Sequence, residues 1–109
     1  MRQTFEKLVR DGIPARLDAA GVRYGTRTAS PDETGTLLLK KRHEEVGELL
    51  AATTDAEALD EIADISEVLT ALASRYGADE AQMRARQSTK RDDRGGFDRG
   101  TVLCWTETS

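Results

Sequence analysis

Hydrophobic residues recur every three or four positions along two long segments in the middle of the chain. In the second segment the apolar residues at this spacing are Ile62, Ile65, Leu69, Leu72 and Tyr76. Such a repeat places the side chains on one face of a helix. A helix start signal with Ser30 as the cap precedes the first segment, and Thr54 with Glu57 fits a capping box before the second. We therefore expect two consecutive helices, over residues 31–52 and 55–76.

Shorter elements are predicted on either side of these two helices. Ile13-Pro14 opens a short helix that ends near Gly21, and Asp79 caps a further helix from Glu80 to about Arg91. The remaining candidates are an extended arm or strand at residues 5–10, an edge strand at 22–29 and a strand at 101–106.

Composition favours a helical fold. The chain has 109 residues, of which 38% are hydrophobic and only 5% aromatic, so the core must consist mainly of Leu, Ile, Val and Ala. Charged residues make up 33%, which is high for a monomer with a large interior. We expect a single domain over residues 1–109: a mainly α helical bundle with short N- and C-terminal extended segments. We also expect the bundle to be completed by a second copy, as a homodimer or homotetramer.

Charge and cysteine content exclude several classes of protein. The net charge of −4 gives no general affinity for nucleic acid, and the single Cys104 excludes an internal disulfide and a Cys-rich zinc site. The charged N-terminus lacks the apolar run of a signal peptide. No segment approaches the roughly 18 apolar residues of a membrane span. A cytoplasmic location without membrane contact is the default expectation.

Carboxylates are paired on both central helices. Glu45 with Glu48, and Glu61 with Asp64, are three residues apart and so share a helix face. Several of them lie at the edge of the apolar stripe; Glu45, for example, follows Leu38 by seven residues. Four carboxylates near a core would repel one another, and a hard divalent cation is the simplest compensation. The alternative is that they are exposed acids on ordinary amphipathic helices.

Two basic clusters stand out in this acidic chain. The first spans residues 7–14 and contains Arg10; the second spans residues 90–97. Beside a cation held by carboxylates, Arg and Lys side chains and glycine amides are typical of triphosphate binding. The predicted phosphate contacts are Arg10, Lys90, Arg91, Arg94, Gly95 and Gly96. Pairing of the second cluster with Asp92 and Asp93 is the alternative.

Together these motifs resemble the all-α nucleoside triphosphate pyrophosphohydrolases, the MazG-like superfamily. The resemblance lies in Glu44-Glu45-x-x-Glu48, a twelve-residue gap and Glu61-x-x-Asp64, and in the flanking segments 7–14 and 90–97. The flanks resemble a short single-domain branch of predicted house-cleaning enzymes. The resemblance implies a helical oligomer that binds Mg²⁺, or Mn²⁺, through Glu45, Glu48, Glu61 and Asp64, with Glu44 as an extra acid.

The implied activity is hydrolysis of a nucleoside triphosphate between its α- and β-phosphates. Mg²⁺ would polarise the phosphoryl group, and Glu45 or Glu48 would accept a proton from the attacking water. His43, the only histidine, is expected to have a structural role beside the acids. Two alternatives remain open: phosphoribosyl-ATP hydrolysis in histidine biosynthesis, and a non-catalytic, metal-stabilised helical module that binds nucleotides or a partner.

Overall fold

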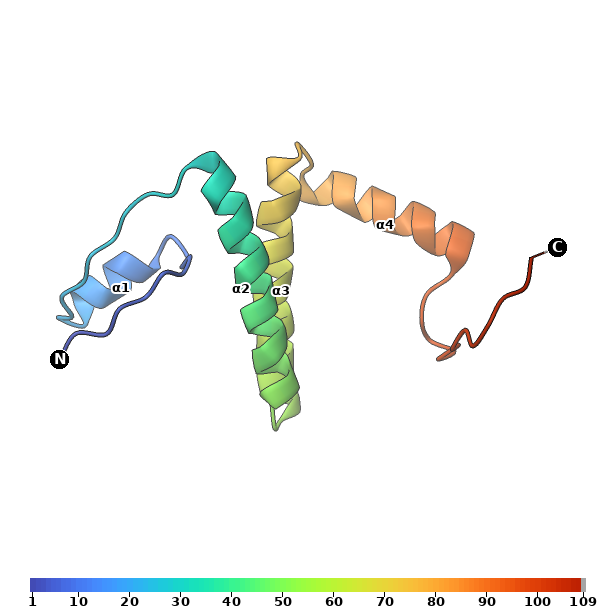
Figure 1. The fold of residues 1–109 in the computed structure, drawn as a ribbon, viewed down its shortest axis with the longest axis horizontal. Coiled ribbons are helices and arrows are strands. Elements are labelled where there is room, and N and C mark those ends of the chain that lie inside the picture. Colours follow the sequence, from blue (N-terminus) through green and yellow to red (C-terminus); the bar gives the residue numbers. More distant parts are fainter. Residues whose placement is uncertain (109) are drawn as a thin grey trace. The chain divides into compact units, whose positions relative to one another are not determined.

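The computed structural model describes residues 1–108, which contain four α-helices and no β-strand (Figure 1). The helices are α1 (Ile13–Ala19), α2 (Pro31–Ala51), α3 (Asp55–Arg75) and α4 (Glu80–Arg94). The prediction of a mainly α fold is confirmed. No helix in the described part of the chain is long and apolar enough to cross a membrane.

The strands predicted at residues 22–29 and 101–106 are wrong. Both segments are non-helical, but neither forms a backbone ladder with another segment. The arm at residues 5–10 is likewise non-helical and unpaired within residues 1–108. A strand needs a hydrogen-bonded neighbour, and no two of these segments pair within residues 1–108. Their β-branched and aromatic residues raised the local preference without supplying that neighbour.

The start of α2 follows the predicted signal. The Ser30 hydroxyl accepts a hydrogen bond from the Glu33 amide at 3.2 Å, and Pro31 occupies the first turn, where its missing N–H is not needed. The helix ends at Ala51, one residue before the predicted end.

The start of α3 differs in one detail from the predicted capping box. Thr54 Oγ1 accepts from the Glu57 amide at 3.2 Å, as expected. The Glu57 carboxylate, however, accepts from the amide of Thr53 at 2.9 Å rather than from that of Thr54. It thus satisfies a backbone donor one residue further out, in the link between α2 and α3.

A complete capping box begins α4. The Asp79 carboxylate accepts from the Gln82 amide, and the Gln82 side chain accepts from the Asp79 amide, both at 2.8 Å. The helix continues to Arg94, three residues beyond the predicted end, and stops at Gly95, whose φ of 82° suits glycine.

Helices α2 and α3 lie side by side as an antiparallel hairpin (Figure 1). Only three residues among 1–108 are buried: Leu38 and Glu45 on α2, and Val68 on α3. All three lie on the hairpin helices. The core is therefore a narrow seam between two helices, and one of its three buried members carries a carboxylate.

The chain divides into two compact units. The first is Met1–Gly77, with α1 and the α2–α3 hairpin; the second begins at Ala78 and contains α4. The second unit has no buried residue up to position 108. The expectation of one domain over residues 1–109 stays a prediction.

Candidate metal centre

Five carboxylates lie along the hairpin, three on α2 and two on α3. Ligand atoms of Glu44, Glu45 and Glu48 lie within 4.8 Å of one another, and so do those of Glu45, Glu61 and Asp64. Glu45 belongs to both groups and joins them. We call these five residues the acidic cluster. The four predicted ligands, together with Glu44, are thus brought to one place by the packing of α2 on α3.

The position of the acidic cluster follows from helix periodicity. Glu45 comes two turns after the buried Leu38, and Asp64 comes one turn before the buried Val68, so each shares a face with a core residue. Glu45 is only 5% exposed. The acids therefore lie on or beside the seam of the hairpin, instead of on the solvent face where an amphipathic helix usually places them.

Two oxygens of the acidic cluster are buried without a hydrogen-bond partner in the described residues: Oε2 of Glu45 and Oε2 of Glu61. An unpaired buried carboxylate oxygen costs free energy, because it has lost its water and gained no donor. The cost disappears if an additional positive ligand occupies the site. Both residues belong to the group that also contains Asp64, and an all-carboxylate donor set is what Mg²⁺ or Mn²⁺ prefers.

Lys41 supplies part of the compensating charge. Its Nζ lies 3.3 Å from Glu45 Oε1 and 3.7 Å from Glu44 Oε1. Lys41 was not among the predicted site residues. Its position four residues before Glu45 could have indicated this ion pair, because side chains four residues apart are neighbours on a helix.

Arg10 supplies a second positive charge from a distant part of the chain. Its Nη2 donates to Asp64 Oδ1 at 2.7 Å, across 54 positions of sequence. Arg10 was predicted to contact phosphate; in this structure its partner is instead a predicted metal ligand. Two cations therefore face five acids, and the acidic cluster keeps a net negative charge.

A second contact, made through Arg27, connects the segment that carries Arg10 to α2. Arg27 binds both oxygens of Glu33 on α2 at 2.7 Å and also donates to Glu6 at 3.2 Å. A small cavity of about 110 Å³ separates the segment from α2; it is lined by Glu6, Lys7 and Leu8 on one side and by Leu37, Lys41 and Glu44 on the other. The N-terminal segment thus lies near the acidic cluster.

The carboxylates of Glu45 and Glu61 lie close together, with a ligand atom of each within 4.8 Å of the other. The adjacent Glu45 carboxylate raises the pKa of Glu61 to about 7, and desolvation and the neighbouring Glu48 act in the same direction. Burial raises the pKa of Glu45, but the neighbouring Glu61 and the ion pair with Lys41 outweigh burial and leave that pKa below its usual value. Near neutral pH without metal, the pair therefore carries less than two full negative charges.

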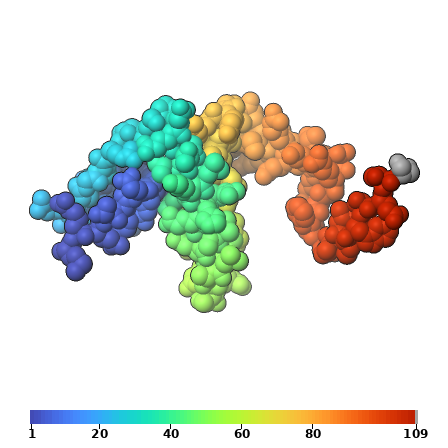
Figure 2. Space-filling view, in the orientation of Figure 1, coloured from blue at the N-terminus to red at the C-terminus, as the bar shows by residue number. Residues whose placement is uncertain are grey.

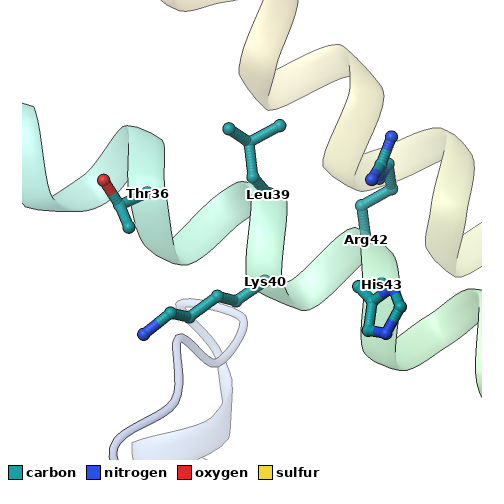
Figure 3. Close-up of a pocket in the computed structure, with 5 residues that line it drawn as sticks. All are labelled: Thr36, Leu39, Lys40, Arg42 and His43. Atoms are coloured by element: carbon teal, nitrogen blue, oxygen red, sulfur yellow. The ribbon is translucent and has the colours of Figure 1, made fainter.

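His43 points elsewhere. It lines a shallow hollow of about 440 Å³ on α2, together with Thr36, Leu39, Lys40 and Arg42 (Figure 3). In the close-up, Lys40 extends toward the N-terminal segment while Leu39 points away from it (Figure 3). His43 contributes no ligand atom to either acidic group.

The remaining predicted phosphate contacts belong to the second unit, at the end of α4. The Arg91 guanidinium lies 3.5 Å from an oxygen of Asp98, and Arg94 Nε lies 3.7 Å from an oxygen of Asp93. Lys90 forms no ion pair within residues 1–108. Of the predicted alternative, pairing with Asp92 and Asp93, only the contact between Arg94 and Asp93 is present in the described residues, and Arg91 pairs with Asp98 instead.

The two glycines after α4 differ in what they offer an anion. The Gly95 amide donates to the Arg91 carbonyl at 2.8 Å and so completes the helix end. Gly96 leaves room for the Arg91 side chain: a Cβ there would lie 2.7 Å from Nη1. The free approach predicted for both amides therefore does not hold for Gly95, and a phosphate-binding role of this segment stays a prediction.

Comparisons of the chain with protein-family models, with curated proteins and with solved structures give no match. The resemblance to MazG-like enzymes therefore rests on the spacing of the acids and on the flanking motifs.

Proposed function

We propose that this protein is a Mg²⁺-dependent nucleoside triphosphate pyrophosphohydrolase, which releases a nucleoside monophosphate and pyrophosphate from a non-standard nucleotide in a house-cleaning role. The observation that carries the proposal is the acidic cluster: carboxylates from two helices gathered at a seam, with two buried oxygens lacking partners. An ordinary surface group of acids would have solvated oxygens. The sequence resemblance connects such a cluster to triphosphate hydrolysis.

The residues fit a divalent cation. Glu45, Glu48, Glu61 and Asp64 would hold the metal, and Glu44 lies within the same ligand distance of Glu45 and Glu48. When bound, Mg²⁺ would supply positive charge to polarise a phosphoryl oxygen and to offset charge on the pyrophosphate leaving group.

Of the two candidate proton acceptors, burial favours Glu48. Glu45 is buried and contributes to both acidic groups, whereas Glu48 is exposed and contributes to one. A group that takes a proton from an attacking water must be reached by that water. Glu48 is therefore assigned as the general base, and Glu45 as the ligand that joins the two groups.

A second copy of the chain completes the fold in this proposal. Large apolar side chains of the hairpin remain exposed in stripes along both helices: Leu39, Val46 and Leu50 on α2, and Leu59, Ile62 and Leu69 on α3, with Tyr76 at the C-cap of α3. The spacings of seven, four and three residues place each set on one face. Figure 2 shows one side of α2 uncovered along its length. Pairing of these stripes between copies would form a four-helix bundle.

The activity is tested by measuring pyrophosphate release from common and modified nucleoside triphosphates and from phosphoribosyl-ATP, with Mg²⁺ or with EDTA. Mg²⁺-dependent release from a triphosphate supports the proposal. Release from phosphoribosyl-ATP alone would assign the chain to that reaction instead. Silence across the panel with Mg²⁺ still bound would favour the non-catalytic module. Glu48→Gln, purified in parallel, controls for a contaminating hydrolase and must be inactive.

The assembly is tested separately by light scattering at micromolar concentration. A dimeric or tetrameric mass is expected for the native chain. Leu50→Lys places a charge in the α2 stripe and is expected to shift the mass toward the monomer, while Lys40→Ala, outside that stripe on α2, serves as the control. A monomeric native chain would contradict the assembly.

A further inference from the structure

We propose that Arg10 occupies the Asp64 carboxylate only while metal is absent, and that a bound divalent cation displaces it so that its guanidinium can hold the substrate's phosphates. This inference rests on the proposed function, because it concerns the same acidic cluster. It adds an exchange of partners to the phosphate contact expected of Arg10.

The bond between Arg10 and Asp64 places a cation where a metal ligand is expected. Asp64 Oδ1 accepts from Arg10 Nη2 at 2.7 Å, and Asp64 also belongs to the group with Glu45 and Glu61 that lies within 4.8 Å. The guanidinium therefore satisfies one acid of that group, while Oε2 of both Glu45 and Glu61 lacks a partner. Arg10 compensates the acidic cluster only in part.

The ion pair between Arg10 and Asp64 is weak enough for a divalent cation to replace the arginine. Both side chains are partly exposed, 55% for Arg10 and 39% for Asp64, so water competes for each of them. A divalent cation at the same carboxylates would repel the guanidinium and attract Asp64 more strongly than one positive charge does. Binding of the metal and the Arg10–Asp64 bond therefore oppose each other.

Released Arg10 would stay beside the cluster. Its segment is anchored at Glu6, where Arg27 bridges to Glu33 on α2, and Arg10 itself directly precedes the turn into α1. Triphosphate oxygens that bind the metal would lie within reach of a guanidinium leaving Asp64, and Arg is well suited to phosphate because it offers two parallel donors.

Calorimetric titration of Mg²⁺ into the metal-free protein, without nucleotide, tests the competition. Arg10→Gln is expected to bind Mg²⁺ about two- to fivefold more tightly than the native chain, the change that corresponds to one exposed ion pair. Arg27→Gln is the matched control: it removes the same charge from a residue that anchors the same segment but touches no acid of the cluster. Its Mg²⁺ affinity is expected to equal that of the native chain.

Displacement itself is tested by brief trypsin treatment with Mg²⁺ or with EDTA. Cleavage after Arg10 is compared by mass spectrometry with cleavage after Arg99, a site in the second unit that serves as internal reference. Mg²⁺ is expected to speed cleavage after Arg10 relative to Arg99 in the native chain. In Asp64→Asn, which lacks the charged partner, cleavage after Arg10 is expected to be fast with and without Mg²⁺.

Binding of inorganic triphosphate at saturating Mg²⁺ tests the second half of the exchange. Arg10→Gln is expected to weaken triphosphate binding about tenfold or more, which is the loss typical of a hydrogen bond to a charged group. The affinity of Arg10→Lys is expected to lie between those of the native chain and Arg10→Gln. Circular dichroism checks that each variant keeps its helices.

The outcomes separate this inference from the proposed function. A native chain that binds no Mg²⁺ overturns both. If it binds Mg²⁺ but Arg10→Gln leaves the affinity unchanged, or the trypsin ratio does not respond to Mg²⁺, the exchange is overturned while the proposed metal site stands. Unchanged triphosphate binding by Arg10→Gln overturns the phosphate contact.

Discussion

The α2–α3 hairpin and helix α4 of the second unit have the same kind of helix start, but they differ in burial. All three helices have a side-chain cap, and the most complete one is on α4, where Asp79 and Gln82 cap each other. Yet every buried residue among positions 1–108 lies on the hairpin. Local signals are thus enough to start a helix, but burial requires a second apolar face in contact.

The two regions also differ in how their charges are satisfied. On α4 and after it, Arg91 and Arg94 pair with acids only a few residues away, and these pairs are exposed. In the hairpin, acids from two helices share a seam, and one of their two cationic partners comes from 54 residues away. Long-range charge clusters of this kind are where ligands are expected, whereas local exposed pairs contribute little.

The largest difference between the regions should appear in turnover. Glu61→Gln or Glu48→Gln removes an acid of the hairpin cluster and is expected to lower Mg²⁺-dependent pyrophosphate release by at least about 100-fold, with helicity retained. Asp92→Asn, which removes an acid of the second unit, is expected to leave the rate within about twofold of the native rate, because exposed charges paired locally contribute little free energy. Equal losses in both regions would contradict the assignment of the site to the hairpin.

A large difference is also expected in stability. Leu38→Ala removes one of the two apolar side chains that are buried among residues 1–108 and should lower the free energy of unfolding by about 2–5 kcal/mol. Leu103→Ala, at a side chain of the second unit that is 79% exposed, should change it by less than about 0.5 kcal/mol. Urea denaturation followed by circular dichroism measures both. A loss at Leu103 as large as at Leu38 would mean that the second unit has a core of its own.

Stability of the metal-free protein should depend on the protonation of Glu61. Because the folded pKa is raised from 4.5 to about 7, the folded state binds more protons than the unfolded state between these values. This contribution is fully present below pH 4.5 and is lost as the pH rises through 7. In EDTA, the melting temperature of the native chain should therefore fall between pH 5 and pH 8 relative to that of Glu61→Gln.

Mg²⁺ should reverse this trend, since a cation favours the ionised carboxylate. At pH 8, added Mg²⁺ is expected to raise the melting temperature of the native chain and to leave Glu61→Gln nearly unchanged. A native chain and variant with the same pH profile in EDTA would show that the pKa of Glu61 is not raised in the folded protein.

The smallest expected effect concerns the caps. Asp79→Ala removes the best cap of α4 and should cost about 1 kcal/mol, visible as faster amide exchange in the first turns of α4 alone. Ser30→Ala removes the cap of α2 and should cost a similar amount, but the loss should spread to α3 because the two helices pack together. Confined effects in both cases would argue against cooperative folding of the hairpin.

The sequence by itself determined the helices and the candidate ligands. The caps at Ser30, Thr54 and Asp79 were all predicted, since a cap is a hydrogen bond between groups three residues apart. The pairs Glu45–Glu48 and Glu61–Asp64 could also be predicted from the sequence, because helix periodicity alone places residues three apart on one face. Chemistry that depends on three or four positions of separation needs no knowledge of the fold.

Only the tertiary structure decided which of these groups meet. The packing of α2 on α3 buries Glu45, brings it to Glu61 and leaves an oxygen of each without a partner. It also decided that Arg10 contacts Asp64, and that residues 22–29 and 101–106 find no strand to pair with. These outcomes depend on contacts between segments far apart in the chain, and neither local preference nor periodicity contains the distances that bring such segments together.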